Sequence, residues 1–179
     1  KAFRNTISIE KSPEENLKKI MKLSKIPASQ ITVTAMNRQA NSSIIQAAQK
    51  LGTQLILIEA GDLLWGLKAL LSDPEKPIIA MGRGGAEEGA ITQIAAHALH
   101  ATGQLQAMEQ EENVESIDKT PIWETDDYVK APRSMSSVIF SAITSNTLFD
   151  LNKTKLKNSY CETVYIDHLG LHKNLQITI

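Results

Sequence analysis

The chain has 179 residues, of which 42% are hydrophobic and 22% are charged, and its formal net charge is −1. This length and composition indicate a soluble globular protein, and the near-neutral charge excludes a general attraction to nucleic acid or membrane surfaces. No apolar run approaches the roughly 20 residues needed to cross a bilayer. The single cysteine, Cys161, cannot form an internal disulfide, so we expect a reducing, cytoplasmic setting.

The first 103 residues alternate between helical and strand patterns. Ser12 can cap a helix that has Pro13 at its first position and Glu15 completing a capping box. Asn41 or Ser42 can cap a second helix, and Asp62 can cap a third. The predicted strands are 31–36, 55–58 and 77–81, and the predicted helices are 13–26, 42–51, 63–71 and 86–103. The runs at 55–58 and 77–81 are continuously apolar, which is typical of strands buried on both faces of a parallel sheet.

This alternation predicts an α/β fold, with a mostly parallel sheet flanked by helices and residues 1–179 in a single domain. Beyond residue 103 the pattern weakens. Residues 136–143 are predicted as a strand, and CETVYID and KNLQITI as the two strands of a closing antiparallel hairpin. Residues 109–127 are acidic and give no clear prediction.

Polar residues follow each of the three predicted strands. They are Asn37-Arg38, the run from Glu59 to Asp62, and the run from Gly82 to Glu88. In open α/β sheets, ligands bind beyond the carboxyl ends of the strands. If the three strands are neighbours, these loops converge on one cleft.

The glycine-rich run MGRGGAEEGA, residues 81–90, matches no standard phosphate-binding motif. It lacks the Gly-Lys-Ser/Thr of a P-loop and the last glycine of the dinucleotide fingerprint. Its glycines still allow backbone N–H groups to approach an oxyanion at a helix start. Glu87 and Glu88 favour the helix dipole, or can reach a divalent cation. The alternative is a plain strand-to-helix turn.

Other polar residues carry two interpretations each. Arg38 can bind a phosphate through two parallel hydrogen bonds, or it can be an ordinary surface arginine. Asp62 is first a helix cap, with a sugar-hydroxyl contact as an addition. His97 and His100 lie three apart without a third metal ligand, so we expect structural or surface roles for them. The sequence shows no Ser-His-Asp arrangement and no nucleophile elbow.

Several of these segments together resemble the second half of the class II fructose-1,6-bisphosphatases. The family pattern has an Asp-Arg-Pro-Arg-His run, a helix, a strand and Asp-Gly-Asp, followed by a Gly-Gly-x-Pro-Glu-Gly turn. The matching segments are AMNRQANSSIIQAAQKLGTQLILIEAGD, MGRGGAEEGAITQIAAHALHATGQLQ and, more weakly, SSVIFSAITSN with the closing hairpin; SPEENLKKIMK resembles the family's linker helix. The family has the fold of the inositol-phosphatase-like sugar phosphatases. It hydrolyses the 1-phosphate of fructose 1,6-bisphosphate with Mg²⁺ or Mn²⁺, and some members accept sedoheptulose 1,7-bisphosphate.

The resemblance implies a role for each matching residue. Arg38 would contact a substrate phosphate, Asp62, Gly84 and Gly85 would lie at the sugar, and Glu88 would bind Mn²⁺ or Mg²⁺. The family's other metal ligands and its water-activating groups lie in the preceding half. We therefore expect this chain to be the carboxyl-terminal, substrate-binding domain of a longer, homo-oligomeric cytoplasmic enzyme, with no catalytic residue of its own and no activity alone.

The chain departs from the family pattern at several positions. The family's second arginine, its proline, its first aspartate and the proline before its glutamate are replaced by Ala40, Gln39, Ala60 and Glu87, respectively. One alternative is therefore a non-catalytic relative that acts as an oligomerisation or regulatory module. A nucleotide-binding α/β domain of another family is a further alternative, which the broken glycine fingerprint disfavours.

Overall fold

Three parallel strands form the sheet of the amino-terminal part. The computed structural model describes residues 7–106, 109–111, 114–116, 121–141, 160–161, 163–173 and 177–178. The strands are β1 (Thr32–Met36), β2 (Gln54–Ile58) and β3 (Ile78–Ala80), in the order β2-β1-β3. Val33 of β1 stands opposite Leu55 of β2 and Ile79 of β3. The predicted parallel α/β arrangement is confirmed.

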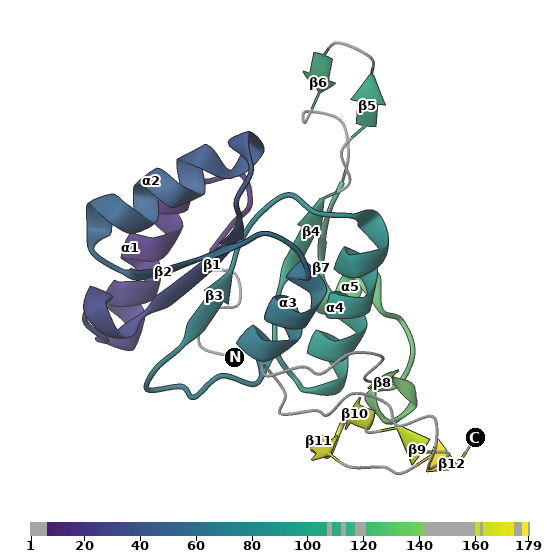
Figure 1. The fold of residues 1–179 in the computed structure, drawn as a ribbon. Helices are drawn as coiled ribbons and strands as arrows, with labels where there is room; N and C mark the ends of the chain where they lie inside the picture. Colours follow the sequence, from purple (N-terminus) through teal and green to yellow (C-terminus); the bar gives the residue numbers. More distant parts are fainter. Residues whose placement is uncertain are drawn as a thin grey trace.

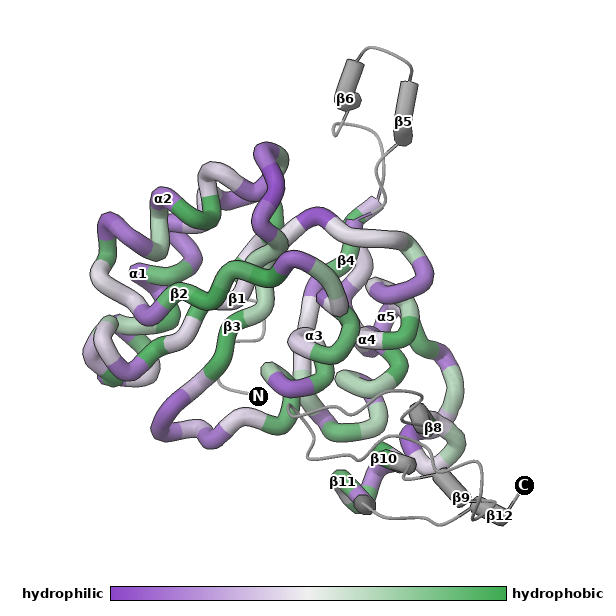
Figure 2. Tube along the Cα trace, viewed as in Figure 1, coloured by the Kyte–Doolittle hydropathy of each residue, from purple (hydrophilic) through white to green (hydrophobic). Residues whose placement is uncertain are grey.

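Helices cover both faces of this sheet (Figure 1). One face carries α1 (Pro13–Ser24) and α2 (Ser42–Leu51), and the other carries α3 (Asp62–Leu70), against which α4 (Ala86–Ala98) packs. Short 3₁₀ turns, η1 (Ala28–Gln30) and η2 (Gln39–Asn41), flank β1. Figure 2 shows hydrophilic and hydrophobic residues alternating along α1 and α2, the pattern of helices with one buried face. The core between these helices and the sheet contains Leu17, Ile20, Ile31, Val33, Ala47 and Ala48.

The predicted start of the first helix is confirmed. The Glu15 N–H donates to Ser12 Oγ at 3.2 Å, and the Ser12 N–H donates to the Glu15 carboxylate at 3.0 Å. Next to this box, Glu14 accepts from Lys18 at 2.7 Å and from Lys50 of α2 at 2.8 Å. These two hydrogen bonds, Lys18 first, lower the pKa of Glu14 to about 2. Glu14 therefore ties α1 to α2.

A second, antiparallel sheet packs beside α4. It contains β8 (Val138–Ser141), β10 (Thr163–Asp167) and β11 (Gly170–Lys173), in the order β11-β10-β8. Its inner face supplies Val164 and Ile166 to a core shared with Leu67 of α3 and Ala95 of α4. The 3₁₀ turn η3 (Arg133–Met135) leads into β8. Residues 142–143, at the end of the predicted strand 136–143, lie outside the described residues.

The closing hairpin differs from the prediction in its second strand. The chain turns at residues 168–169, and the return strand is β11 rather than KNLQITI. Gly170 starts it with φ +123°, a conformation that glycine adopts without the steric cost of a side chain. Ile177–Thr178 (β12) pairs instead with Tyr160–Cys161 (β9).

The region without a clear prediction contains paired strands. The strands are β4 (Gln104–Gln106) with β7 (Ile122–Glu124), and β5 (Glu109–Glu111) with β6 (Val114–Ser116). Figure 1 shows β5 and β6 projecting away from the body. The short helix α5 (Thr125–Tyr128) follows. Acidic and amide residues dominate these strands, so the usual β-branched signal was absent.

Two further predictions are corrected. β1 is the central strand, so β2 and β3 are the outer strands of this sheet. They are not buried on both faces, and Leu57 of β2 is 43% exposed. The last predicted helix ends at Ala98 rather than near Gly103. His100 adopts φ +56°, and the Ala101 N–H bonds the Ala96 carbonyl, which closes the helix end without a glycine.

None of the helices in the described ranges combines the length and apolarity needed to span a bilayer.

Candidate active-site edge

The three polar loops meet at one edge of the parallel sheet. Because β1 pairs in parallel with both neighbours, the loop after β1 lies between the loops after β2 and β3. Asn37 donates to the Glu59 carboxylate at 2.8 Å, which joins the first two loops. Asn41 accepts from the Arg83 N–H at 2.9 Å, which joins the loop after β1 to the glycine-rich turn. The predicted convergence of the loops is confirmed.

Asn41 has a role that the sequence analysis missed. It occupies the N-cap position of α2, for which Asn41 and Ser42 were both candidates, but its side chain makes no cap hydrogen bond. The side chain is fully buried, and it donates to the Met36 carbonyl at 3.0 Å while accepting from Arg83. The available signal was its position, since Asn41 stands where the family's Asp-Arg-Pro-Arg-His run has its histidine.

Asp62 does not cap α3 as predicted. Gly61, in the left-handed conformation at φ +85°, is the N-cap residue, and Asp62 is the first residue of the helix. One carboxylate oxygen accepts from the Leu63 N–H at 3.1 Å. The other lies against Gly84, where any Cβ would collide with it. The structure therefore places Asp62 against the glycine-rich turn, and this approach requires glycine at position 84.

Glu88 also lies against the turn. It is the third residue of α4, and its carboxylate folds back over Gly85, so that a Cβ on Gly85 would overlap it. Asp62 and Glu88 thus approach the paired glycines 84 and 85, whereas Glu87 is exposed. Within the part of the chain that the structure describes, no three His, Cys, Asp or Glu side chains gather as a metal site. Glu88 supplies one carboxylate, which is an incomplete set of ligands.

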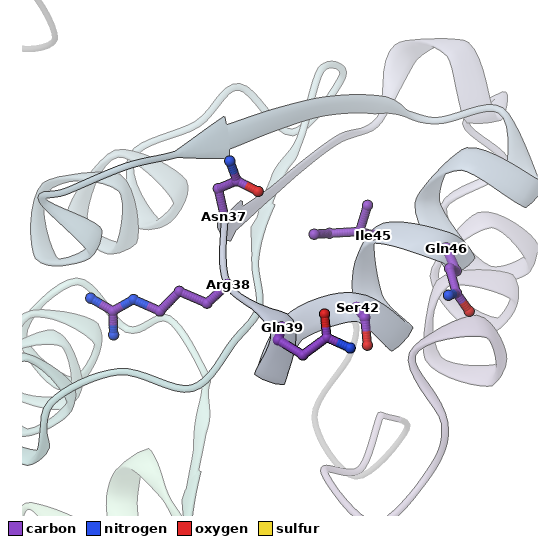
Figure 3. A pocket seen from close by; sticks show the side chains of 6 residues that line it. All are labelled: Asn37, Arg38, Gln39, Ser42, Ile45 and Gln46. Atoms are coloured by element: carbon purple, nitrogen blue, oxygen red, sulfur yellow. The ribbon is translucent and has the colours of Figure 1, made fainter.

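Arg38 projects from the loop after β1. Its backbone is extended, with φ −137°, and its side chain is exposed. An open pocket of about 220 Å³ adjoins it; the lining residues are Asn37, Arg38, Gln39, Ser42, Ile45 and Gln46. Figure 3 shows the guanidinium pointing away from Ser42 and Gln46. The exposed Ala40 and Ala60 lie in the loops after β1 and β2 at the same edge.

Comparison with known proteins decides the family. The family model described as bacterial fructose-1,6-bisphosphatase, glpX-encoded, matches residues 1–174. The chain belongs to this family. No curated protein matches it. Family membership makes the protein a phosphatase of the fructose-1,6-bisphosphatase type, as the resemblance predicted.

A buried polar network anchors the other end of α4 in this bisphosphatase-family chain. His97 Nδ1 lies 2.9 Å from Ser136 Oγ, and its Nε2 lies 3.9 Å from Asp126 Oδ1. Arg133 donates to Asp126 and to the His97 carbonyl, each at 2.6 Å. Serine, histidine and aspartate thus come together in space. However, His97 and Ser136 are buried and Asp126 is bound to Arg133, so the group is structural rather than nucleophilic. His100 is exposed, beyond the helix end.

The His97 network predicts a pH-dependent stability. Burial, followed by the nearby Arg133 charge, lowers the pKa of His97 below its ordinary 6.5. The unfolded chain therefore binds a proton at a higher pH than the native chain does. The stability that comes from keeping His97 neutral is fully present above pH 6.5. It is lost as the pH falls from there toward the native-state pKa. We expect the free energy of unfolding, measured in urea at a series of pH values, to show this loss in the wild-type protein.

The variant His97→Asn keeps a polar atom near Ser136 but cannot titrate. It should flatten the pH dependence over this range. His100→Asn is the matched control, because asparagine accepts the left-handed conformation of that residue. A wild-type slope that persists in His97→Asn would show that other groups cause it.

Proposed function

We propose that this chain forms the substrate-binding part of a Mn²⁺- or Mg²⁺-dependent phosphatase that removes the 1-phosphate of fructose 1,6-bisphosphate in the cytoplasm. The observation that supports it is the meeting of the three loops at one edge, with Asp62 held against Gly84. That edge combines an exposed arginine, a carboxylate and a glycine-rich turn. The arginine can hold a phosphate, the carboxylate can accept hydrogen bonds from sugar hydroxyls, and the turn allows other groups to approach its backbone closely.

Each residue has a distinct part in the proposed binding. The Arg38 guanidinium is always charged and presents a planar fork, so it binds the distal 6-phosphate through paired hydrogen bonds. The Asp62 carboxylate accepts hydrogen bonds from the sugar hydroxyls. Gly84 and Gly85 leave the room that the Asp62 and Glu88 carboxylates occupy, so that both acidic groups lie against the turn beside the sugar. Together they orient the bisphosphate with its 1-phosphate toward the start of α4.

The cation belongs at Glu88 in this proposal. Mg²⁺ and Mn²⁺ prefer carboxylate ligands, and a bound cation would offset the repulsion between the phosphate and the carboxylates of Asp62 and Glu88. The described residues supply no complete set of ligands for the cation. We propose that the remaining ligands and the water-activating groups come from an amino-terminal half and that the enzyme is a homo-oligomer.

The phosphate contact is tested by Arg38→Ala. A hydrogen bond to a charged group contributes about 1.5–3 kcal/mol, so affinity should fall roughly tenfold to a hundredfold. Isothermal titration of the 179-residue chain with fructose 6-phosphate and with fructose 1,6-bisphosphate should show the loss for both ligands. Affinity for fructose 1-phosphate should change little.

The control is Lys76→Ala. Lys76 is an exposed cation before β3, at the amino-terminal ends of the strands and so opposite the three loops. If the two variants bind all three sugar phosphates alike, Arg38 does not contact the 6-phosphate. If the wild-type chain and the full-length protein bind none of these ligands at millimolar concentration, the proposed function is wrong.

The cation site is tested by Glu88→Gln. In the wild-type chain, Mn²⁺ should strengthen the binding of fructose 1,6-bisphosphate, and the variant should lose this effect while keeping its melting temperature. The matched control is Glu87→Gln, which removes an equivalent charge from the same helix turn but from an exposed side chain. Equal Mn²⁺ enhancement in both variants would remove Glu88 as a ligand.

A second candidate function is supported by Ala40 and Ala60. They stand where the family pattern has an arginine and an aspartate, and both are exposed at the same edge as Arg38. Two small apolar side chains there describe a pocket that has lost polar contacts. The alternative is therefore a non-catalytic relative that acts as an oligomerisation or regulatory module.

Ala40→Arg separates the two candidates. If the chain is a working substrate-binding domain with a weakened pocket, restoring the second guanidinium should tighten binding of fructose 1,6-bisphosphate roughly tenfold or more. Calorimetry measures this against Gln46→Arg, which adds the same charge on the far side of the pocket. No gain over that control, together with no wild-type binding, would favour the non-catalytic candidate.

A further inference from the structure

The side chain of Asn41 is a buried link between two loops that bind different parts of the proposed substrate. It is 0% exposed, and both of its polar atoms have partners. Its amide nitrogen donates to the Met36 carbonyl, and its oxygen accepts from the Arg83 N–H. Its own backbone N–H donates to the Arg38 carbonyl at 2.9 Å. One residue thus holds the peptide of Arg38 and the glycine-rich turn in a fixed relation.

The turn is shaped to receive this amide. Gly82 has φ +155°, which favours glycine, and a Cβ there would lie 3.3 Å from the Asn41 oxygen and 3.4 Å from its nitrogen. The absence of a side chain at Gly82 therefore lets Asn41 pack directly against the turn. Asp62 approaches the same turn at Gly84, two residues further on. Asn41 and Asp62 bracket Arg83 from the loops after β1 and β2.

A buried amide of this kind fixes geometry. Its two partners are a carbonyl and an N–H, so the orientation of the amide is set, and leaving either partner buried without a hydrogen bond would be costly. Loops held in their bound arrangement lose less conformational freedom when a ligand binds. The benefit is greatest for a ligand that must contact both loops at once.

We propose that Asn41 is a positioning residue that sets the spacing between Arg38 and the glycine-rich turn, and thereby selects sugar bisphosphates over monophosphates. This inference rests on the proposed function, because it takes Arg38 and the turn as the two ends of one binding site. Asn41 itself touches no substrate. It acts through the backbone of Arg83 and through the strand end that carries Arg38.

The first test needs no ligand. Amide hydrogen exchange, measured by NMR on the 179-residue chain, should show faster exchange of the Arg83 amide in Asn41→Ala than in the wild-type protein. Asn41→Asp keeps an acceptor for that N–H, so the Arg83 amide should stay protected even though the donor to Met36 is lost. If Asn41→Ala does not fold, the nearly isosteric Asn41→Leu answers the question, because it also removes the acceptor for the Arg83 N–H but leaves no cavity.

The second test is the ratio of two affinities. Asn41→Ala should weaken binding of fructose 1,6-bisphosphate roughly threefold to tenfold more than binding of fructose 1-phosphate, which lacks the phosphate that Arg38 contacts; this is the effect of losing one ordering hydrogen bond. The matched control is Asn16→Ala. Asn16 is also a buried asparagine that bonds a backbone N–H and carbonyl, both of Ser8, and it belongs to none of the three loops. Its loss should change stability without changing the ratio.

The outcomes separate the two ideas. If the wild-type chain binds neither ligand but the Arg83 amide loses protection in Asn41→Ala, the proposed function fails and the structural link stands. If the ligands bind but Asn41→Ala weakens both equally, or leaves the Arg83 amide as protected as before, the positioning role is overturned. An equal change of the ratio in Asn16→Ala would also overturn it, because general loosening of the fold would then explain the effect.

Discussion

Parallel hydrogen bonding on both sides of β1 is the constraint from which the site follows. A strand that pairs in parallel with two neighbours brings all three carboxyl ends to one edge, whatever the intervening helices do. The chain leaves β1 toward α2 on one face, and leaves β3 toward α4 on the other. The chain segments that follow β1 and β3 therefore diverge toward opposite faces of the sheet. Ligands of open α/β sheets bind at such a point of divergence. Asn41 spans this separation, and Asp62 reaches the turn on its far side.

Features determined by neighbouring residues were predictable from the sequence. The capping box at Ser12, the glycine that ends α2 at Gly52, and β1 itself depend on residues within a few positions of one another. The three loops were predicted as well, because polar residues after apolar strands mark the ligand edge of an α/β sheet. The position of Arg38, Asp62 and Glu88 in these loops was therefore predicted without knowledge of the strand order.

Features determined by distant residues were not predictable in this way. The apolar runs of β2 and β3 suggested full burial, but which strand is central depends on pairing across the sheet. Asp62 looks like a cap from its neighbours, but Gly61 takes that place and the carboxylate turns toward Gly84, 22 positions away. The same holds for Asn41, whose partner Arg83 is 42 positions along the chain. A single sequence carries little information about such contacts.

The helix α4 connects the site to the rest of the molecule. Its first turn holds Glu88 and its last turn holds His97, whose ring and carbonyl bond Ser136 and Arg133 next to the second sheet. The buried network and the Leu67–Ala95 core fix the helix from its far end. The position of the first turn is therefore set by packing about 13 Å away along the helix axis, because Glu88 and His97 are nine residues apart and each helical residue rises about 1.5 Å. Substitutions around Ser136 would reach the site through this rigid element.

The outer margins of β2 and β3 have a separate consequence. In the described part of the chain, each of these strands is paired along one side only, which leaves a row of backbone donors and acceptors facing outward. New strands from elsewhere can extend the sheet sideways along either row. Such growth runs perpendicular to the strand direction, whereas the three loops lie at the strand tips. The sheet can therefore widen in an assembly while the mouth of the proposed phosphate site stays open to solvent.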